Sequence, residues 1–173
     1  MKKILTLCVA VMAAVTMSAK TYEHSIGVVG GLGLGAQYKT MLMDNFTLID
    51  EFGYFMCISN GSYAGAIDNL VLAYQAPAAE GQGIKLEWYA GGQIKMGYEQ
   101  TTNGGVFGIG GAAGIEAIMK GAPIAFSFDF RPGYGLVYFN TGFGGMATGH
   151  MFDYSFNLGV RYIIPTATKA AKK

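Results

Sequence analysis

Apolar and polar residues alternate along most of this chain. In residues 84–99, one set of alternate positions begins with Ile84, Leu86 and Trp88 and continues with apolar or small residues. The positions between them begin with Lys85 and Glu87 and include two further charged residues. Because successive side chains of a β-strand point to opposite faces, this segment predicts a strand with one apolar face and one charged face.

The same period of two recurs in five other segments, which are residues 46–59, 69–75, 107–119, 124–131 and 152–164. Turn-forming sequences such as Asn60-Gly61 and Asn103-Gly104-Gly105 separate them. Asp50 interrupts the apolar face of residues 46–59, where it predicts either a bulge or the end of the strand's membrane-facing part.

Residues 26–39 fit either one strand of about fourteen residues or two shorter strands. Because a closed single-chain barrel with both ends on one side needs an even number of strands, two are favoured. A three-residue turn at Val29-Gly30-Gly31 would then pair Val28 with Leu32. The expected total is eight strands.

The side chains on the two faces of the predicted strands indicate which face lies toward lipid and which lies in the barrel interior. The apolar faces carry Phe, Tyr, Trp, Leu and Ile, whereas the opposite faces carry Gly, Ala, Ser and charged residues. A soluble lipocalin-like barrel would place its large apolar residues inside. Here a lipid-facing exterior around a narrow polar interior fits better, so the predicted fold is all-β, an eight-stranded antiparallel transmembrane up-and-down barrel.

Composition and the N-terminus agree with this prediction. The chain of 173 residues is 51% hydrophobic and only 13% charged, whereas soluble domains are about 25% charged. Residues 1–19 have Lys2 and Lys3, an apolar run and small residues at the end, which is the layout of a secretory signal peptide cleaved near Ala19. Residues 20–164 would form the barrel.

The mature chain offers few other functions. Loss of Lys2 and Lys3 leaves ten of the 12 basic residues against 11 acidic ones, a net charge of −1, so no nucleic-acid partner is expected. Cys57 is the one cysteine left, which excludes an intramolecular disulfide.

Four stretches in succession carry a family resemblance: "YKTMLMDNFTLIDEFGY", "LEWYAGGQIKMGY", "IGGAAGIEAI" followed by "PIAFSFDFRPG", and "FNLGVRYII". Together they resemble the strands of small eight-stranded outer-membrane β-barrel proteins of Bacteroidetes, over residues 25–164. The resemblance implies the barrel fold and a place in the outer membrane of a Gram-negative cell envelope. It implies no agreed molecular activity.

The last predicted strand also resembles the assembly signal that the outer-membrane insertion machinery reads. Asn157, Gly159, Tyr162 and Ile164 fill its places. Residues 165–173 follow as a basic tail, expected either as a disordered periplasmic extension or as a contact to anionic lipid or cell wall.

Alternate positions of a strand point to the same face, and we call this assignment of a residue to the inner or outer face its parity. Parity places eight charged residues inside the barrel: Glu51, Lys85, Glu87, Lys95, Glu116, Asp129, Arg131 and Arg161. Buried charges need partners, and an eight-stranded barrel is too narrow for a water channel. An ion-pair network that fills the lumen is therefore favoured over a path for protons or small ions.

Chemistry beyond this network has little support. An esterase or acyltransferase needs a Ser, a His and an acid within reach, but the chain has two histidines, His24 and His150. Asp153 and Ser155 are near His150 in sequence, yet parity points both into the lumen. No catalytic residues, metal site or cofactor are predicted, and the chain is expected not to be an enzyme.

The expected role is structural or interactive, with a closed lumen and with the outer-membrane bilayer as the main partner. Residues 136–151 are predicted as the one long loop, with Phe139, Phe143, Met146 and His150 as candidate contacts for a partner. Two alternatives remain open. They are an outer-membrane enzyme that modifies lipid A or phospholipid, and a secreted soluble barrel that binds a lipophilic ligand.

Overall fold

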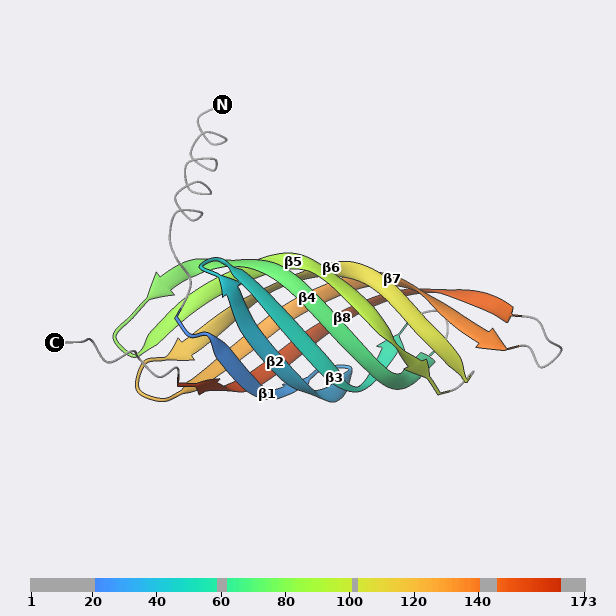
Figure 1. Ribbon diagram of the computed structural model, residues 1–173, viewed down its shortest axis with the longest axis horizontal. Coiled ribbons are helices and arrows are strands. Elements are labelled where there is room, and N and C mark those ends of the chain that lie inside the picture. Colours follow the sequence, from blue (N-terminus) through green and yellow to red (C-terminus); the bar gives the residue numbers. More distant parts are fainter. Residues whose placement is uncertain (1–20, 59–61, 101–102, 141–145, 166–173) are drawn as a thin grey trace, which may run out of the picture.

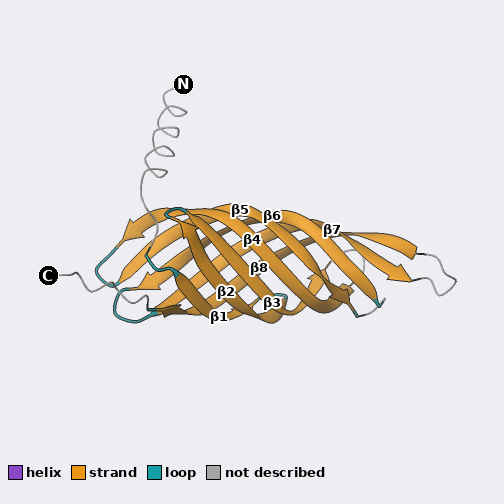
Figure 2. Ribbon diagram, in the orientation of Figure 1, coloured by secondary structure: helices purple, strands orange, loops and turns teal. Residues whose placement is uncertain are grey.

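The protein is a closed antiparallel β-barrel of eight strands in up-and-down order in the computed structural model (Figures 1 and 2). The structure describes residues 21–58, 62–100, 103–140 and 146–165. The strands are β1 (His24–Gly30), β2 (Gly33–Met43), β3 (Phe46–Ile58), β4 (Ser62–Glu80), β5 (Ile84–Glu99), β6 (Gly104–Met119), β7 (Ile124–Asn140) and β8 (Met146–Ile164). Within these residues, no helix has both the length and the apolar character needed to cross a bilayer.

The predicted count of eight strands is confirmed, including the division of residues 26–39 into two. The predicted length of the turn between these two strands is confirmed, but its predicted position is wrong. Val28 pairs with Ala36 and Gly30 with Leu34, so residues 31–33 connect the paired positions, two residues later than predicted, and Leu32 is not a partner of Val28. Three-residue loops are common in antiparallel hairpins, and Gly31 lies so close to the backbone of Phe156 that a side chain would not fit there.

The register fixes the width of the barrel. The pairs that start from Val28 and run through β2 to β7 arrive at His150 of β8, whereas the direct partner of Val28 is Val160, ten residues away. Eight strands with a stagger of this size enclose an interior just wide enough for side chains. The lumen is therefore filled by protein groups.

The two faces of the wall differ as the alternation predicts. On β8, Phe156, Leu158 and Tyr162 are exposed on the outside, whereas Asn157 and Arg161 are buried inside. The same division holds on β5, where Ile94 and Met96 are exposed and Gln93 and Lys95 are buried. The described outer wall is thus largely apolar, and the described lumen carries most of the polar and charged side chains.

Asp50 is an exception on the outer wall. It is exposed and pairs with Tyr38 on one side and Leu70 on the other, in mid-strand and without a bulge. The register shifts lie elsewhere, between Met41 and Met43 and between Pro77 and Ala79. The expectation of a bulge at Asp50 is therefore wrong, whereas its alternative, the end of the strand's membrane-facing part, stays a prediction.

The two ends of the barrel differ, and we call them the even end and the uneven end. The even end contains the start of β1 and the end of β8, where His24 pairs with Ile164. At the other end the β1–β2 turn stops part-way along the long axis, whereas the β7–β8 hairpin continues to the far end (Figure 1). β1 has seven residues and β8 has 19, so residues 146–157 of β8 extend beyond the last residue of β1.

The long loop predicted at residues 136–151 is correspondingly much shorter. β7 continues to Asn140 and β8 begins at Met146, which pairs with it, so Phe139, Met146 and His150 lie in strands. Their side chains and the whole of Phe143 lie outside what the structure describes. Glycine, which usually signals a loop, is accommodated here within a paired hairpin. The predicted signal peptide and residues 166–173 of the tail also lie outside the described residues.

Candidate functional site in the charged lumen

The structure brings the predicted lumen charges together inside the barrel. Seven of them are almost fully buried: Glu51, Glu87, Lys95, Glu116, Asp129, Arg131 and Arg161. The eighth, Lys85, is partly exposed at the even end and pairs with Glu87 at 2.7 Å. The parity argument for these eight residues is confirmed in placement. Five of them form two clusters, and these are Glu51, Glu116, Asp129, Arg131 and Arg161.

The first cluster surrounds Arg131 on β7. Its guanidinium holds Glu51 of β3 through both terminal nitrogens, with Nη2 donating to Oε1 at 2.6 Å. Arg131 Nε donates to Asp129 Oδ1 at 2.7 Å. Asp129 also accepts hydrogen bonds from the Tyr89 hydroxyl at 2.7 Å and from Asn157 Nδ2 at 3.0 Å. One cation thus faces two carboxylates, and neutral donors share the excess negative charge.

The second cluster surrounds Glu116 on β6. Its carboxylate accepts hydrogen bonds from Lys39, from Arg161 Nη2 at 2.5 Å, from the Tyr22 hydroxyl at 2.7 Å and from Gln75 Nε2 at 3.0 Å. Lys39 and Arg161 place two cations on one carboxylate. This excess of positive charge is opposite to that around Arg131.

Gln37 joins the two clusters. Its side-chain amide donates to Glu51 and accepts from Arg161, so a single neutral residue of β2 contacts the negative cluster and the positive cluster together. Arg161 Nη1 also donates to Ser127 Oγ at 3.1 Å. Such a network holds both arginines in fixed positions, because each guanidinium is bound at several of its nitrogens.

The segment before β1 closes the lumen at the even end. Tyr22 is 6% exposed and packs with Ile118 and Ala125 while its hydroxyl bonds Glu116. Thr21 Oγ1 donates to Glu87 Oε1 at 2.8 Å. Burial raises the pKa of Tyr22 well above its ordinary value, and the Glu116 carboxylate adds to this effect. The phenol therefore stays neutral and remains a donor at physiological pH.

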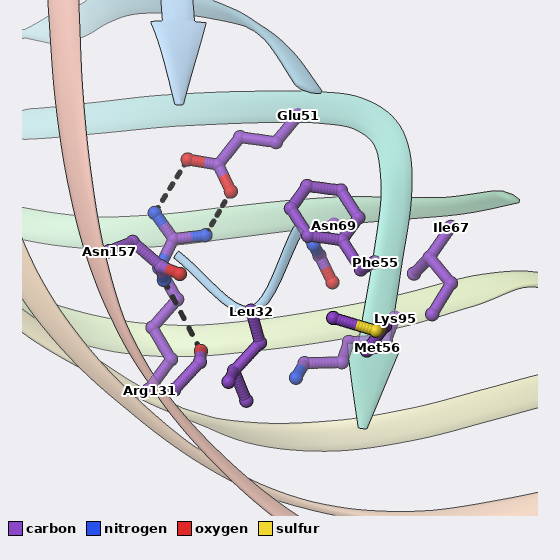
Figure 3. A pocket seen from close by; sticks show the side chains of 10 residues that line it. Leu32, Glu51, Phe55, Met56, Ile67, Asn69, Lys95, Arg131 and Asn157 are labelled. Carbon is purple, nitrogen blue, oxygen red and sulfur yellow. Dashed lines mark hydrogen bonds and ion pairs between the residues drawn. The ribbon is translucent and has the colours of Figure 1, made fainter. Parts of the chain in front are cut away.

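A small cavity lies beside the Arg131 cluster, just inside the β1–β2 turn. Figure 3 shows it with Glu51 and Arg131 joined on one side and with Phe55, Ile67 and Met56 on the other. Its volume is about 20 Å³, enough for about one water molecule. The Oδ1 atom of Asn69, which lines this cavity, has no protein partner among the described residues, so a water molecule suits this site.

The described residues offer little for nucleophilic or metal chemistry. The His24 side chain is exposed, and its Nδ1 lies 2.8 Å from the Tyr38 hydroxyl and 3.1 Å from Thr40 Oγ1. The side chains of His150 and Asp153 are not described, so the structure does not test their proximity. No group of three or more His, Cys, Asp or Glu residues suited to a metal ion occurs in the described part of the chain.

Several members of the two clusters were not among the predicted residues of the charge network. Lys39, Gln37, Gln75, Tyr89 and Tyr22 are buried members of the two clusters. Gln37 and Lys39 are the two neighbours of Tyr38, whose side chain faces outward. Alternation therefore places both of them in the lumen, and this signal could have identified them as members of the network. Tyr22 had no such signal, because it precedes β1 and its position depends on how the N-terminal segment enters the barrel.

The assembly-signal residues all lie on β8. Asn157 and Gly159 face the lumen, whereas Tyr162 and Ile164 are exposed on the outer wall. A scan against protein-family models and searches of curated proteins and solved structures gave no match for this chain.

Proposed function

We propose that this protein is an outer-membrane β-barrel protein of a Gram-negative bacterium, with a sealed lumen and a structural or interaction role without catalysis. The observation that carries the proposal is the distribution of polarity across the wall. Large apolar side chains are exposed on the outside of every strand, while Arg131, Arg161 and Glu116 are buried in the lumen. In water this arrangement exposes far more apolar surface than a soluble protein tolerates, whereas lipid is a favourable solvent for it.

Aromatic side chains support a membrane position. Tyr38, Trp88 and Tyr162 lie on the outer wall toward the even end, and Tyr54, Tyr98 and Tyr154 lie toward the uneven end. Two such groups of tyrosine and tryptophan, with aliphatic residues and phenylalanine between them, correspond to the aromatic girdles of membrane barrels. The closed ladder of hydrogen bonds from β1 to β8 would satisfy the backbone N–H and C=O groups within the bilayer.

The sealed lumen speaks against the secreted-binder alternative. A barrel that carries a lipophilic ligand keeps an apolar interior volume for it. Here Arg131 and Arg161 with their carboxylate partners occupy the centre, and the cavity beside them measures about 20 Å³. The resemblance to Bacteroidetes barrels agrees with a membrane barrel and leaves the partner open.

Cell fractionation tests the membrane assignment. We expect the protein in the detergent-extracted outer-membrane fraction, where it migrates faster on gels before boiling than after boiling, as closed barrels do. Recovery in the soluble periplasmic fraction would refute the proposal.

A liposome-swelling assay with a small sugar tests the seal separately. We expect swelling no faster than in protein-free liposomes, with a known porin as the positive control. An unchanged lipid A and phospholipid profile in a deletion strain is expected if the protein is not a lipid-modifying enzyme.

A further inference from the structure

The uneven end of the barrel leaves one edge of β8 without a hydrogen-bonded partner strand among the described residues. β1 pairs with β8 only from Leu158 to Ile164, because the β1–β2 turn begins at residue 31. Residues 146–157 of β8 continue past this turn and pair with β7 on their other side. β3 approaches β8 beyond the turn, but no pairing between these two strands occurs among the described residues.

The direction of the backbone groups on this edge follows from the register. Neighbouring residues of a strand direct their N–H and C=O groups to opposite sides. Ile163 N donates to Pro123 O, at the start of β7, so odd-numbered residues of β8 face β7. The β7–β8 register continues without a shift up to the Asn140–Met146 pair. Phe152 and Tyr154 therefore direct their N–H and C=O groups away from β7. They point to the side on which β1 pairs with β8 further along the strand, but where β1 no longer extends.

This edge has few of the features that normally prevent pairing with other chains. Natural edge strands carry lysine, proline, a bulge or an inward-pointing charge, or are very short. Residues 146–157, "MATGHMFDYSFN", contain one charged residue, Asp153, and no lysine or proline. The pairing with β7 shows no bulge over this length. The edge is long and continues the β1–β8 ladder, so its geometry already suits an antiparallel strand.

We propose that the free edge of β8 beyond the β1–β2 turn binds an extended segment of another protein by strand addition. The added strand takes the place that a longer β1 would occupy and runs antiparallel to β8. Phe152 and Tyr154 are exposed on the outer face, with ring centroids 6.5 Å apart, and contact alternate apolar side chains of the added strand. This inference rests on the proposed function, because outer-membrane barrels place their short turns in the periplasm and their longer hairpins outside, so the uneven end would face away from the cell.

Two other occupants fit this edge less well. A lipid chain has no groups that bond backbone N–H and C=O. A second copy in the same membrane carries β8 with the same direction and tilt, and strands of membrane barrels tilt by about 35–45°. The two facing strands would therefore cross steeply and not lie side by side.

A synthetic peptide provides the probe. The sequence YGLVYFN, residues 134–140, pairs antiparallel with residues 146–152 on the other edge of β8. The peptide carries flanking lysines for solubility and a fluorophore, and its binding to the full-length barrel in detergent micelles is followed by fluorescence anisotropy. We expect saturable binding that a scrambled peptide of the same composition does not show.

Phe152→Pro is the test variant and Phe152→Ala is its matched control. Proline removes one N–H from the free edge but none from the pairing with β7, whereas alanine removes the ring and keeps the N–H. We expect proline to weaken binding about fivefold or more relative to alanine, the loss of one hydrogen bond. Equal binding by both variants, or by the scrambled peptide, would overturn the proposal. The gel shift on boiling verifies that each variant is a folded barrel.

Hydrogen exchange on the unmodified protein provides a second readout if the proline variant does not fold. We expect the peptide to slow exchange at the amides of Phe152 and Tyr154 but not at Ser155, which faces β7. Slowing at all three amides or at none contradicts strand addition, and a dimer that forms without peptide contradicts the choice of partner. Because binding is measured in micelles, failure of the membrane assignment appears separately, in the fractionation.

Discussion

Removal of the Arg131 side chain should destabilise the barrel strongly. In an Arg131→Met variant, Glu51 and Asp129 lose their shared cation, although both carboxylates are about 1% exposed. Loss of one partner of a buried ion pair costs about 3–5 kcal/mol, because an uncompensated charge remains in a region of low dielectric constant. Methionine fills much of the space of the arginine stem, so the loss reflects the charge more than a cavity.

A reversible urea titration of the barrel in lipid vesicles measures this loss. The chain has a single tryptophan, Trp88, whose fluorescence reports its transfer from the wall to water. We expect the free energy of unfolding to fall by about 3–5 kcal/mol with an unchanged dependence on urea concentration.

Two controls separate burial from charge. Lys120→Met breaks the pair with Glu80 at the even end, where the two side chains are 39% and 63% exposed, and should have little effect. The triple variant Glu51→Gln, Asp129→Asn and Arg131→Met removes the whole charge cluster and should recover much of the lost stability. If Arg131→Met cost no more than Lys120→Met, the view of the lumen as a mutually dependent ion-pair network would be refuted.

Three further predictions concern the wall and its even end. Asp50→Leu removes an exposed carboxylate from the apolar outer wall and should raise the free energy of unfolding in vesicles by up to about 2 kcal/mol; a decrease would show that the side-chain hydrogen bond between Asp50 and Asp68 stabilises the wall. Gly91→Val should prevent or weaken folding, because its Cβ would overlap the backbone oxygen of Leu72, whereas Gly83→Val, with open space around it, should fold normally on the gel assay. Tyr22→Ala removes the side chain that closes the even end and should speed hydrogen exchange of backbone amides near that end. Exchange equal to that of the unmodified protein would show that Tyr22 does not seal the lumen there.

The lumen residues illustrate what parity can predict. Glu87, Lys95 and Arg161 were placed inside from alternation alone, because a strand has only two faces and one of them was clearly apolar. Their partners could not be assigned in the same way. Arg161 contacts Glu116 from β6 and Gln37 from β2, and these contacts depend on the stagger of the barrel.

The uneven end shows the opposite case. The glycine-rich residues 140–150 indicated a long loop over residues 136–151, yet Asn140 pairs with Met146, so both flanking strands are longer than predicted. Likewise, the turn after β1 lies two residues later than predicted. Glycine signals where a turn is possible, but strand pairing decides where the chain actually reverses.

The sequence by itself determined that the chain forms eight amphipathic strands and which face of each is apolar, because side-chain direction along a strand is a local property with a period of two. Tertiary structure decided how far each strand extends and which buried charges meet. Both depend on the register between strands, since a barrel closes only when all eight staggers agree. That closure brings Arg131 to Glu51 across the lumen and leaves the edge of β8 free beyond the short β1.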